Sequence, residues 1–162
     1  MYQRIVVPLD GSELAELALI DAREMARMTN APMYIIRSVD YRYMAGFSGF
    51  GVPSGAAGAA ALVEAEEAAV APYLDKIATQ LTEAGIQVQT EVLHGVAARE
   101  IVSVLKPGDL LVMATHGRGG VTRWLLGSVA EDVLRHAPVP VLLVRAGNVD
   151  VSAPGKGAAL VS

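Results

Sequence analysis

Short apolar runs recur along this chain and constrain its fold more than any other feature. Arg4–Leu9, Pro32–Val39, Asp109–Ala114 and Val139–Val144 are rich in apolar residues, and Ile86–Leu93 alternates apolar with polar positions. Nearly continuous apolar runs of this length are typical of strands buried on both faces, as in a parallel sheet. We therefore expect each of these segments to be a strand.

Segments with helical spacing separate the strands. They are Ser12–Thr29, Glu64–Ala84, Val96–Leu105 and Ser128–His136. Ser12 suits the N-cap position of the first, and Pro72 should kink the second or mark its true start. The alternating order predicts an α/β fold: a doubly wound five-stranded parallel sheet with helices on both faces, Rossmann-like and forming a single domain.

Composition narrows the class of protein. The 162 residues suffice for one domain, and no run approaches the roughly 18 apolar residues of a membrane span. The start of the chain lacks the sections of a signal peptide, and there is no cysteine for a disulfide or a thiolate metal site. We expect a cytoplasmic protein. The net charge of -4 disfavours nucleic-acid binding, because such proteins usually present a basic face.

Two segments do not fit the alternation. Residues 41–60 combine glycine and alanine with four aromatic residues, and we expect a flexible surface loop there, with a lid or packing surface as the alternative. Residues 146–162 follow the last strand and are expected to form a loose C-terminal tail. The predicted domain therefore covers residues 1–145.

Three features fall at the edge where a parallel sheet binds ligands, beyond the carboxyl ends of its strands. Asp10 follows the first strand, Ser38 and Val39 end the second, and residues 115–117 follow the fourth. Asp-Gly-Ser is also a good turn and cap sequence, so a turn role and a ligand role for Asp10 stay equally open.

A glycine-rich segment after the fourth strand indicates phosphate binding. Gly117, Gly119 and Gly120 follow the strand, and Gly127-Ser128 opens the next helix. Glycine lets backbone N–H groups approach phosphate oxygens, and a helix start adds free N–H groups and a favourable dipole. The alternative is a plain loop with a Ser-capped helix. The usual P-loop motif is absent, and the dinucleotide glycine pattern is broken because position 122 is threonine.

Three blocks of sequence resemble the universal stress protein family: RIVVPLDGS, MATHGRGG and LLGSVAEDVLRHAPVPVLLVR. The resemblance runs from Tyr2 to Arg145. The nucleotide-binding branch of that family carries G-x-x-G, nine residues, then G-[ST]; here Gly117, nine residues and Gly127-Ser128 match. Ala114 replaces the first glycine, and a methyl group is compatible with that position if the residue keeps a β conformation.

The resemblance implies a nucleotide site. Its phosphate-binding residues are Gly117, Gly127, Ser128 and the backbone N–H of Val129. Its adenosine-binding residues are Pro8, Asp10, Ser38, Met113 and Ala114. His116 either contacts phosphate or is an exposed or capping histidine. The implied ligand is ATP, with ADP and AMP as alternatives and Mg²⁺ as an optional companion of the nucleotide. The three histidines lack metal-ligand spacing, so we expect no resident metal.

Three functions remain open from the sequence. The leading one is a regulatory stress-response protein that binds an adenine nucleotide and acts on a protein partner, without being a dedicated enzyme. A slow ATPase is the second, with Asp10 and His116 as the only candidate catalytic groups and no evident orienting partner for either. The third is a dimeric interaction module that binds no nucleotide, which Ala114 favours.

The last predicted strand, Val139–Val144, should lie at the edge of the sheet. An apolar unpaired edge favours pairing with another chain, and the resemblance implies an antiparallel homodimer along it. Alternatively, the alternating residues Val149–Ser152 fold back over the edge and leave a monomer. We favour the homodimer because glycine and proline after Ser152 weaken a long tail strand.

Overall fold

The computed structural model describes residues 1–40, 56–115 and 127–145, with side chains from Glu64 onward in the second range. Within these residues the strands are β1 (Arg4–Pro8), β2 (Met33–Val39), β3 (Val88–His94), β4 (Asp109–Ala114) and β5 (Val141–Val144). They form one sheet in the order β3-β2-β1-β4-β5, and every pair is parallel. This confirms the predicted doubly wound parallel sheet.

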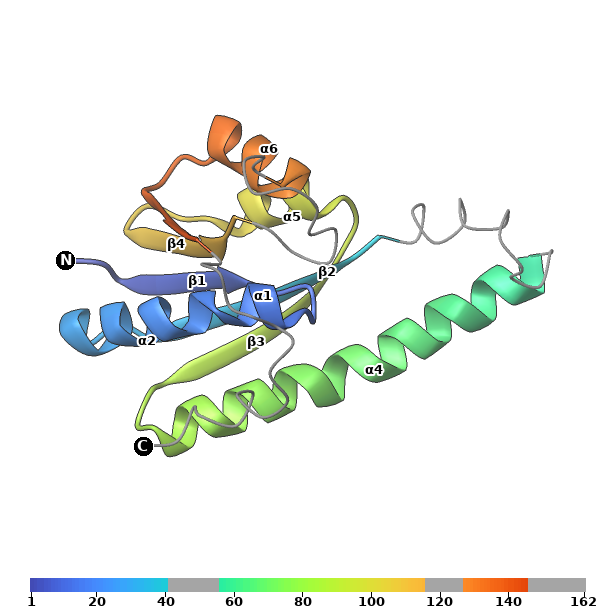
Figure 1. The fold of residues 1–162 in the computed structure, drawn as a ribbon, viewed down its shortest axis with the longest axis horizontal. Helices are drawn as coiled ribbons and strands as arrows, with labels where there is room; N and C mark the ends of the chain where they lie inside the picture. Colours follow the sequence, from blue (N-terminus) through green and yellow to red (C-terminus); the bar gives the residue numbers. More distant parts are fainter. Residues whose placement is uncertain (41–55, 116–126, 146–162) are drawn as a thin grey trace.

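The described helices are α1 (Glu13–Glu16), α2 (Ala18–Thr29), α4 (Ala56–Glu83), α5 (Ala97–Val104) and α6 (Ser128–His136). One core cluster joins the sheet to α1, α2 and α4, and a second joins its other face to α5 and α6. Figure 1 shows these two helical layers with the sheet between them. The predicted helices on both faces are therefore confirmed.

The helix expected over Ser12–Thr29 is divided at Leu17. The N–H of Leu17 donates to the carbonyl of Leu14 at 3.3 Å, and the N–H of Ile20 donates to the carbonyl of Leu17 at 3.2 Å. Hydrogen bonds between residues three apart tighten the backbone at this point, as in a 3₁₀ turn. The prediction of one continuous helix was wrong, and α1 is a separate short helix directly after β1.

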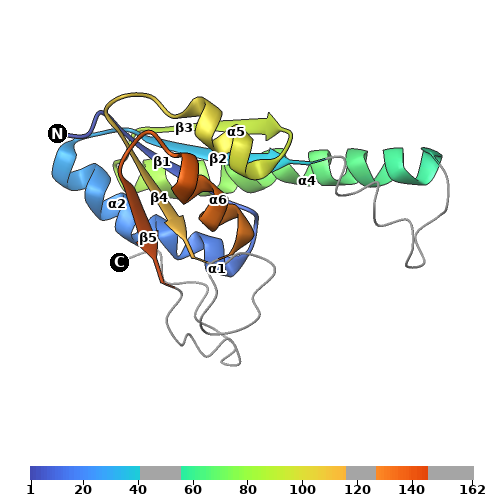
Figure 2. The same cartoon turned by 90° about the horizontal axis from the view of Figure 1, so that it is seen from above.

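Helix α4 begins at Ala56 rather than Glu64, so the loop expected over 41–60 is wrong for residues 56–60. Alanine has the highest helix propensity, and the alanine-rich stretch from Ala56 extends the helix. Residues 41–55 lie outside the described part of the chain. Pro72 lies inside α4, so it does not mark the helix start. The described first turns of α4 run beyond the sheet (Figures 1 and 2).

Strand β5 lies at one end of the sheet, and β4 is its only strand neighbour among the described residues. All four of its residues are half-buried. Figure 2 shows β5 at the opposite side of the sheet from β3. The edge position predicted for the last strand is confirmed. The tail after residue 145, including the alternative strand at 149–152, lies outside the described residues.

An ion pair fastens the amino ends of the two central strands. The guanidinium of Arg4 donates to both carboxylate oxygens of Asp109, from Nε at 3.0 Å and from Nη2 at 2.6 Å, and Nη2 also donates to the carbonyl of Val104 at 2.8 Å. Asp109 is only 3% exposed. Bidentate pairs of this kind are strong and directional, so this contact stabilises the end of the sheet opposite the carboxyl edge. No helix of the described residues is long and apolar enough to cross a membrane.

Candidate functional site

The strand order reverses between β1 and β4. The chain places β2 on one side of β1 and β4 on the other, so the carboxyl ends of β1 and β4 are adjacent. In an open α/β sheet, the crevice outside such a reversal is where ligands bind. Leu9 and Asp10 follow β1, and Thr115 follows β4, so the candidate site lies at this edge.

Asp10 organises the turn after β1. Its Oδ1 accepts hydrogen bonds from the backbone N–H of Ser12 at 2.9 Å and from the Ser12 hydroxyl at 2.6 Å. Gly11 supplies the positive φ of 81° that the turn requires. Ser12 Oγ in turn accepts from the N–H of Ala15 at 3.1 Å and caps α1, as predicted. The turn role of Asp10 is confirmed, and a contact of its carboxylate with a ligand stays a prediction.

A backbone corner joins β4, β5 and α6. The N–H of Thr115 donates to the carbonyl of Val144 at 3.0 Å, and the N–H of Gly127 donates to the carbonyl of Thr115 at 2.8 Å. We call Thr115, Gly127 and Ser128 the α6 corner. The intervening loop, with His116 and Gly117, lies outside the described residues, so their predicted roles are not placed. The bond from Gly127 holds the start of α6 at the end of β4, and the bond from Thr115 joins the end of β4 to β5.

The N-cap of α6 is Gly127, and Ser128 is the first helical residue. The alternative reading of a Ser-capped helix was therefore wrong. No side-chain cap hydrogen bond is made at this helix start among the described residues. The first bond of the helix runs from the N–H of Glu131 to the carbonyl of Gly127 at 2.9 Å. The N–H groups of the three residues before Glu131 thus have no acceptor within the helix, which is the usual state of a helix start and favours an anion there.

The predicted adenosine-binding residues divide between the two faces of the sheet. Successive strand residues point to opposite faces. Met113 packs in the α5 and α6 cluster, and Pro8 and Ser38 are in phase with Val6 and Ile36 of that cluster. These three predicted residues therefore lie on the same face as the α6 corner.

Ser38 and Ala114 show how the edge is built. The Ser38 hydroxyl donates to the carbonyl of Gly95 at 2.8 Å, which ties the end of β2 to the loop after β3. Ala114 is in phase with Val112 of the other core cluster and is 8% exposed. It is the last residue of β4 and pairs with Val144. Its β conformation meets the condition under which a methyl group replaces the first glycine of the pattern.

Gly127, which caps α6, and the first two residues of the helix differ in exposure. Val129 is 38% exposed, Ser128 is exposed and Gly127 is half-buried. The side chains of Ser128 and Val129, two of the predicted phosphate-binding residues, are therefore accessible to solvent. His136 ends α6, as predicted, whereas His94, predicted in a loop, is the last residue of β3. Each lies beside a carboxylate, Glu67 for His94 and Asp132 for His136.

The sequence reading missed a polar group beside the Asp10 turn. Tyr73 of α4 donates from its hydroxyl to Glu16 Oε1 at 3.0 Å, and Arg37 of β2 lies over the Tyr73 ring at 5.4 Å. Burial raises the pKa of Tyr73 above its usual range, and the carboxylates of Glu16 and, more weakly, Asp10 raise it further. The one sequence signal for this group was Arg37 itself, a single cationic residue within a mostly apolar strand.

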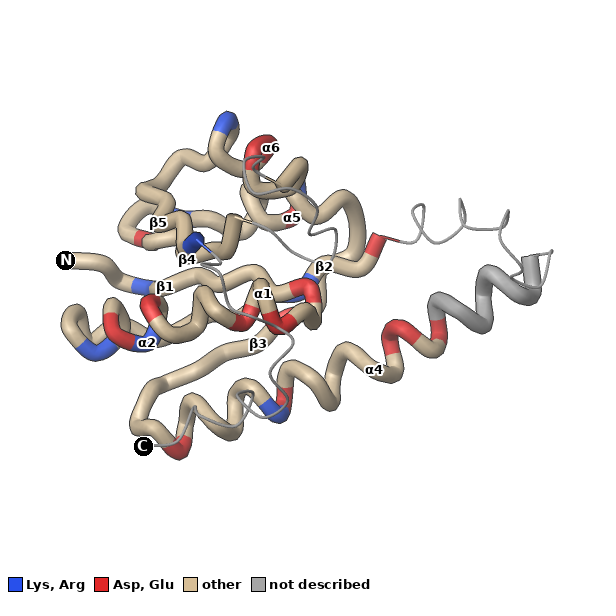
Figure 3. Tube along the Cα trace, in the orientation of Figure 1, with Lys and Arg blue, Asp and Glu red and all other residues tan. Residues whose placement is uncertain are grey.

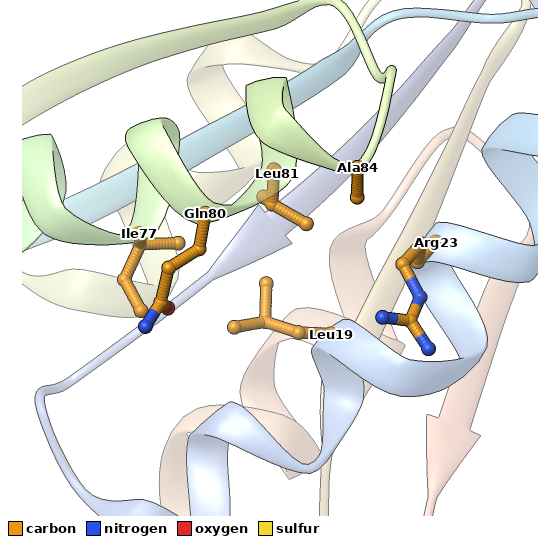
Figure 4. A pocket seen from close by; sticks show the side chains of 6 residues that line it. All are labelled: Leu19, Arg23, Ile77, Gln80, Leu81 and Ala84. Carbon is orange, nitrogen blue, oxygen red and sulfur yellow. The ribbon is translucent and has the colours of Figure 1, made fainter. Parts of the chain in front are cut away.

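A hollow between α2 and α4 is too small to be a ligand site. Figure 4 shows its lining by Leu19, Arg23, Ile77, Gln80, Leu81 and Ala84. Its volume of about 10 Å³ is near the minimum that one water molecule needs. This hollow therefore has no room for a nucleotide, and the candidate site is the carboxyl edge at the reversal of strand order.

Comparison with known proteins is consistent with this geometry. The sequence model of the universal stress protein family matches residues 1–145. Universal stress protein MJ0531 of Methanocaldococcus jannaschii is 38% identical over 153 residues, which cover 90% of this chain and 83% of that protein. The solved structure of MJ0577 from the same organism matches with a TM-score of 0.76 at 26% identity, covering 91% of this chain and 99% of that one. A universal stress protein solved in complex with cAMP shares the fold, with a TM-score of 0.63 at 23% identity over 90% of this chain and 98% of that one. This chain belongs to the universal stress protein family.

Proposed function

We propose that this protein is a regulatory stress-response protein that binds an adenine nucleotide, with ATP as its main ligand, at the carboxyl edge of β1 and β4. The observation that carries the proposal is the α6 corner. There the 2.8 Å hydrogen bond between Gly127 and Thr115 fixes a helix start that has no side-chain cap among the described residues. An uncapped helix start is a ready anion site.

The phosphate end of the nucleotide fits this corner by chemistry. Phosphate oxygens accept hydrogen bonds, and the N–H groups of Ser128 and Val129 have no acceptor within α6. The Ser128 hydroxyl adds an exposed donor. We assign Gly127, Ser128 and Val129 to phosphate binding, and extend the assignment to Gly117 and His116 on the sequence pattern alone. Mg²⁺ would accompany ATP through the phosphates.

The adenosine end fits the neighbouring strand ends. Pro8, Ser38 and Met113 share the α5 and α6 face with the corner, and we assign them, with Asp10 and Ala114, to the nucleoside. Two proteins of the same fold were solved with adenine nucleotides: one with cAMP, and one from Archaeoglobus fulgidus with dAMP. Each is 23% identical to this chain, which is evidence for a shared fold alone, so the corner carries the argument for the ligand.

We propose regulation rather than dedicated catalysis. A general base needs a carboxylate or imidazole within reach of the attacking water. The Oδ1 of Asp10 already accepts two hydrogen bonds from Ser12, which commits that oxygen to the turn. The carboxylate is therefore better suited to shaping the site than to activating water.

We also propose that the protein acts in the cytoplasm as a homodimer joined along β5, with residues 1–145 as the functional domain and a protein partner downstream. Among the described residues β5 has a strand neighbour on one side only, and its half-buried apolar side chains support the dimer. The alternative function, a dimeric module that binds no nucleotide, was favoured by Ala114 alone. Ala114 is extended, and an extended alanine is compatible with the proposed site.

Mass spectrometry of the denatured, freshly purified protein tests the ligand directly. We expect a co-purified adenine nucleotide in an amount comparable to the protein, and its mass distinguishes ATP, ADP and AMP. A nucleotide-free protein that also binds no added adenine nucleotide would contradict the proposed function.

A further inference from the structure

A buried cation connects the long helix α4 to the sheet near the candidate site. Arg37 lies in β2 between Ile36 and Ser38 and is 5% exposed. It is in phase with Ile35 of the α4-side core cluster, and its Nη2 pairs with Glu66 of α4. A buried charge is costly unless it is paired, so the Glu66 carboxylate is held firmly against the end of β2.

The same cation contacts a second residue of α4. The Arg37 guanidinium lies over the Tyr73 ring, 5.4 Å from its centre, within the range of a cation–π interaction. The Tyr73 hydroxyl donates to Glu16 Oε1 at 3.0 Å. Arg37 and Tyr73 thus link three elements, β2, α4 and α1, through contacts between side chains that are far apart in the sequence.

A side-chain contact from α4 adds to the backbone that joins α1 through Leu17 to α2. Helix α1 spans only Glu13–Glu16, and Ala15 is its only buried residue. At its start, Ser12 caps the helix and is itself held by Asp10. At its end, Glu16 accepts from Tyr73. The Asp10 turn is therefore held on one side by β1 and on the other by α1, which continues into the buried start of α2 and accepts a hydrogen bond from α4.

Helix α4 has a weak point beside these contacts. Pro72 lies within it and cannot donate the backbone hydrogen bond to the residue four positions earlier, Ala68. Arg37 contacts α4 on both sides of this break, at Glu66 before it and at Tyr73 after it. Figure 3 shows the acidic residues of α1 and those of α4 beside its grey first turns. The two Arg37 contacts therefore hold the turns of α4 on either side of Pro72 in line, together with Val70, which packs in the core just before Pro72.

We propose that Tyr73, held by Arg37, is a positioning residue for the Asp10 turn and couples this turn to the segment of α4 before Pro72. The proposal rests on the proposed function in so far as the turn contacts a nucleotide. Coupling of this kind is reciprocal. A ligand that orders the Asp10 turn therefore also orders residues 64–71, and loosening those residues weakens the ligand.

The test compares variants of the full-length protein by amide hydrogen exchange and by calorimetric titration with ATP. Tyr73→Phe removes only the hydroxyl, and Glu16→Leu removes the acceptor. Both should accelerate exchange in residues 13–17 and in residues 64–71 together, and should weaken ATP binding about fivefold, the lower end of typical coupling. Glu16→Gln keeps an acceptor oxygen for Tyr73, so it should restore exchange and affinity to within about twofold of the original protein.

Thr79→Val is the matched control. It also removes a hydroxyl from α4, one that donates to the carbonyl of Asp75 on an exposed face, so it should leave both segments unchanged. Acceleration of the α4 segment alone, or equal effects of Glu16→Gln and Glu16→Leu, would overturn the coupling. If the original protein binds no ATP, the proposed function fails, and the exchange rates of the nucleotide-free variants still decide the coupling.

Discussion

The backbone N–H of Gly127 donates to the carbonyl of Thr115 across 2.8 Å and so joins the start of α6 to the end of β4. The same Thr115 donates to Val144 at the end of β5. Three elements that meet at one residue make a rigid corner. The N–H groups at the start of α6 have no acceptor within the helix, and on this ground we propose that phosphate binds there.

Gly127→Val should weaken ATP binding at least tenfold, about 1.4 kcal/mol. The new side chain adds bulk where a phosphate group approaches the backbone. The fold should survive, because Gly127 has a φ of -60° and a ψ of 146°, an extended conformation that valine adopts readily. Calorimetry measures the affinity, and thermal unfolding verifies the fold. Unchanged affinity in a folded variant would remove this corner from the site.

ATP hydrolysis should be negligible as a biological turnover. Oδ1 of Asp10 is committed to Ser12, and the sequence lacks the lysine of a P-loop. Phosphate release from the purified protein is the measurement. Sustained turnover near about 1 per second, within the ordinary enzyme range, and its loss in Asp10→Ala would show that the protein is an ATPase.

Leu143→Lys should lower the mass that light scattering reports from that of a dimer toward that of a monomer. The residue lies in β5, at the open edge of the sheet, and a charge there opposes pairing with a second copy. Met28→Lys is the control, since it adds the same charge on α2 at a residue that is 74% exposed. An original protein that is monomeric at tens of micromolar, above the roughly micromolar scale of a specific dimer, would refute the dimer and leave the nucleotide site standing.

Asp109→Ala should lower the free energy of unfolding by about 3 kcal/mol, because it leaves the Arg4 guanidinium without its bidentate partner in a buried setting. Nucleotide affinity should stay unchanged, since this pair lies at the amino ends of the strands. Glu131→Ala removes the exposed partner of Arg135 and should leave stability unaltered. Urea unfolding compares the two variants. An equal loss of unfolding free energy in the two variants would mean that the buried ion pair stabilises the protein no more than a surface ion pair does.

Tyr73 should make the protein sensitive to alkaline pH. Burial, followed by the Glu16 carboxylate, raises the pKa of the folded-state hydroxyl above the usual value of 10.0. The folded state thus holds this proton more tightly, so the stabilisation is full below about pH 10 and is lost as the pH rises above it. Tyr73→Phe should therefore lose less stability than the original protein in urea unfolding between about pH 8 and pH 11. A parallel decline in both proteins would contradict the raised pKa.

The strands and helices of this fold could be predicted from the sequence because their signals are local. The apolar run at Asp109–Ala114 and the helix at Ser128–His136 lie where hydrophobic periodicity placed them. The start of α4 could not be predicted from the sequence, because an alanine- and glycine-rich stretch is compatible with both a loop and a helix. Helix propensity was the only local signal that distinguished the loop from the helix.

The candidate site could be predicted only in part. Asp10 and Ser12 were recognisable because an Asx turn and a helix cap have short sequence signatures. The contact between Arg37 and Tyr73 could not be recognised in the sequence, because it joins β2 to α4 through tertiary packing that leaves no periodic pattern. The cap of α6 shows the same limit: glycine and serine are both good caps, and the structure selects Gly127.

Calorimetric titration of the nucleotide-stripped, full-length protein with ATP in the presence of Mg²⁺ tests the central claim most directly. We predict saturable binding at one site per chain with a dissociation constant near or below about 10 micromolar, some 7 kcal/mol of binding free energy. We also predict competition by ADP and AMP for the same site. Absence of saturable binding up to about 1 millimolar ATP, where the binding free energy would be only about 4 kcal/mol, would contradict the account.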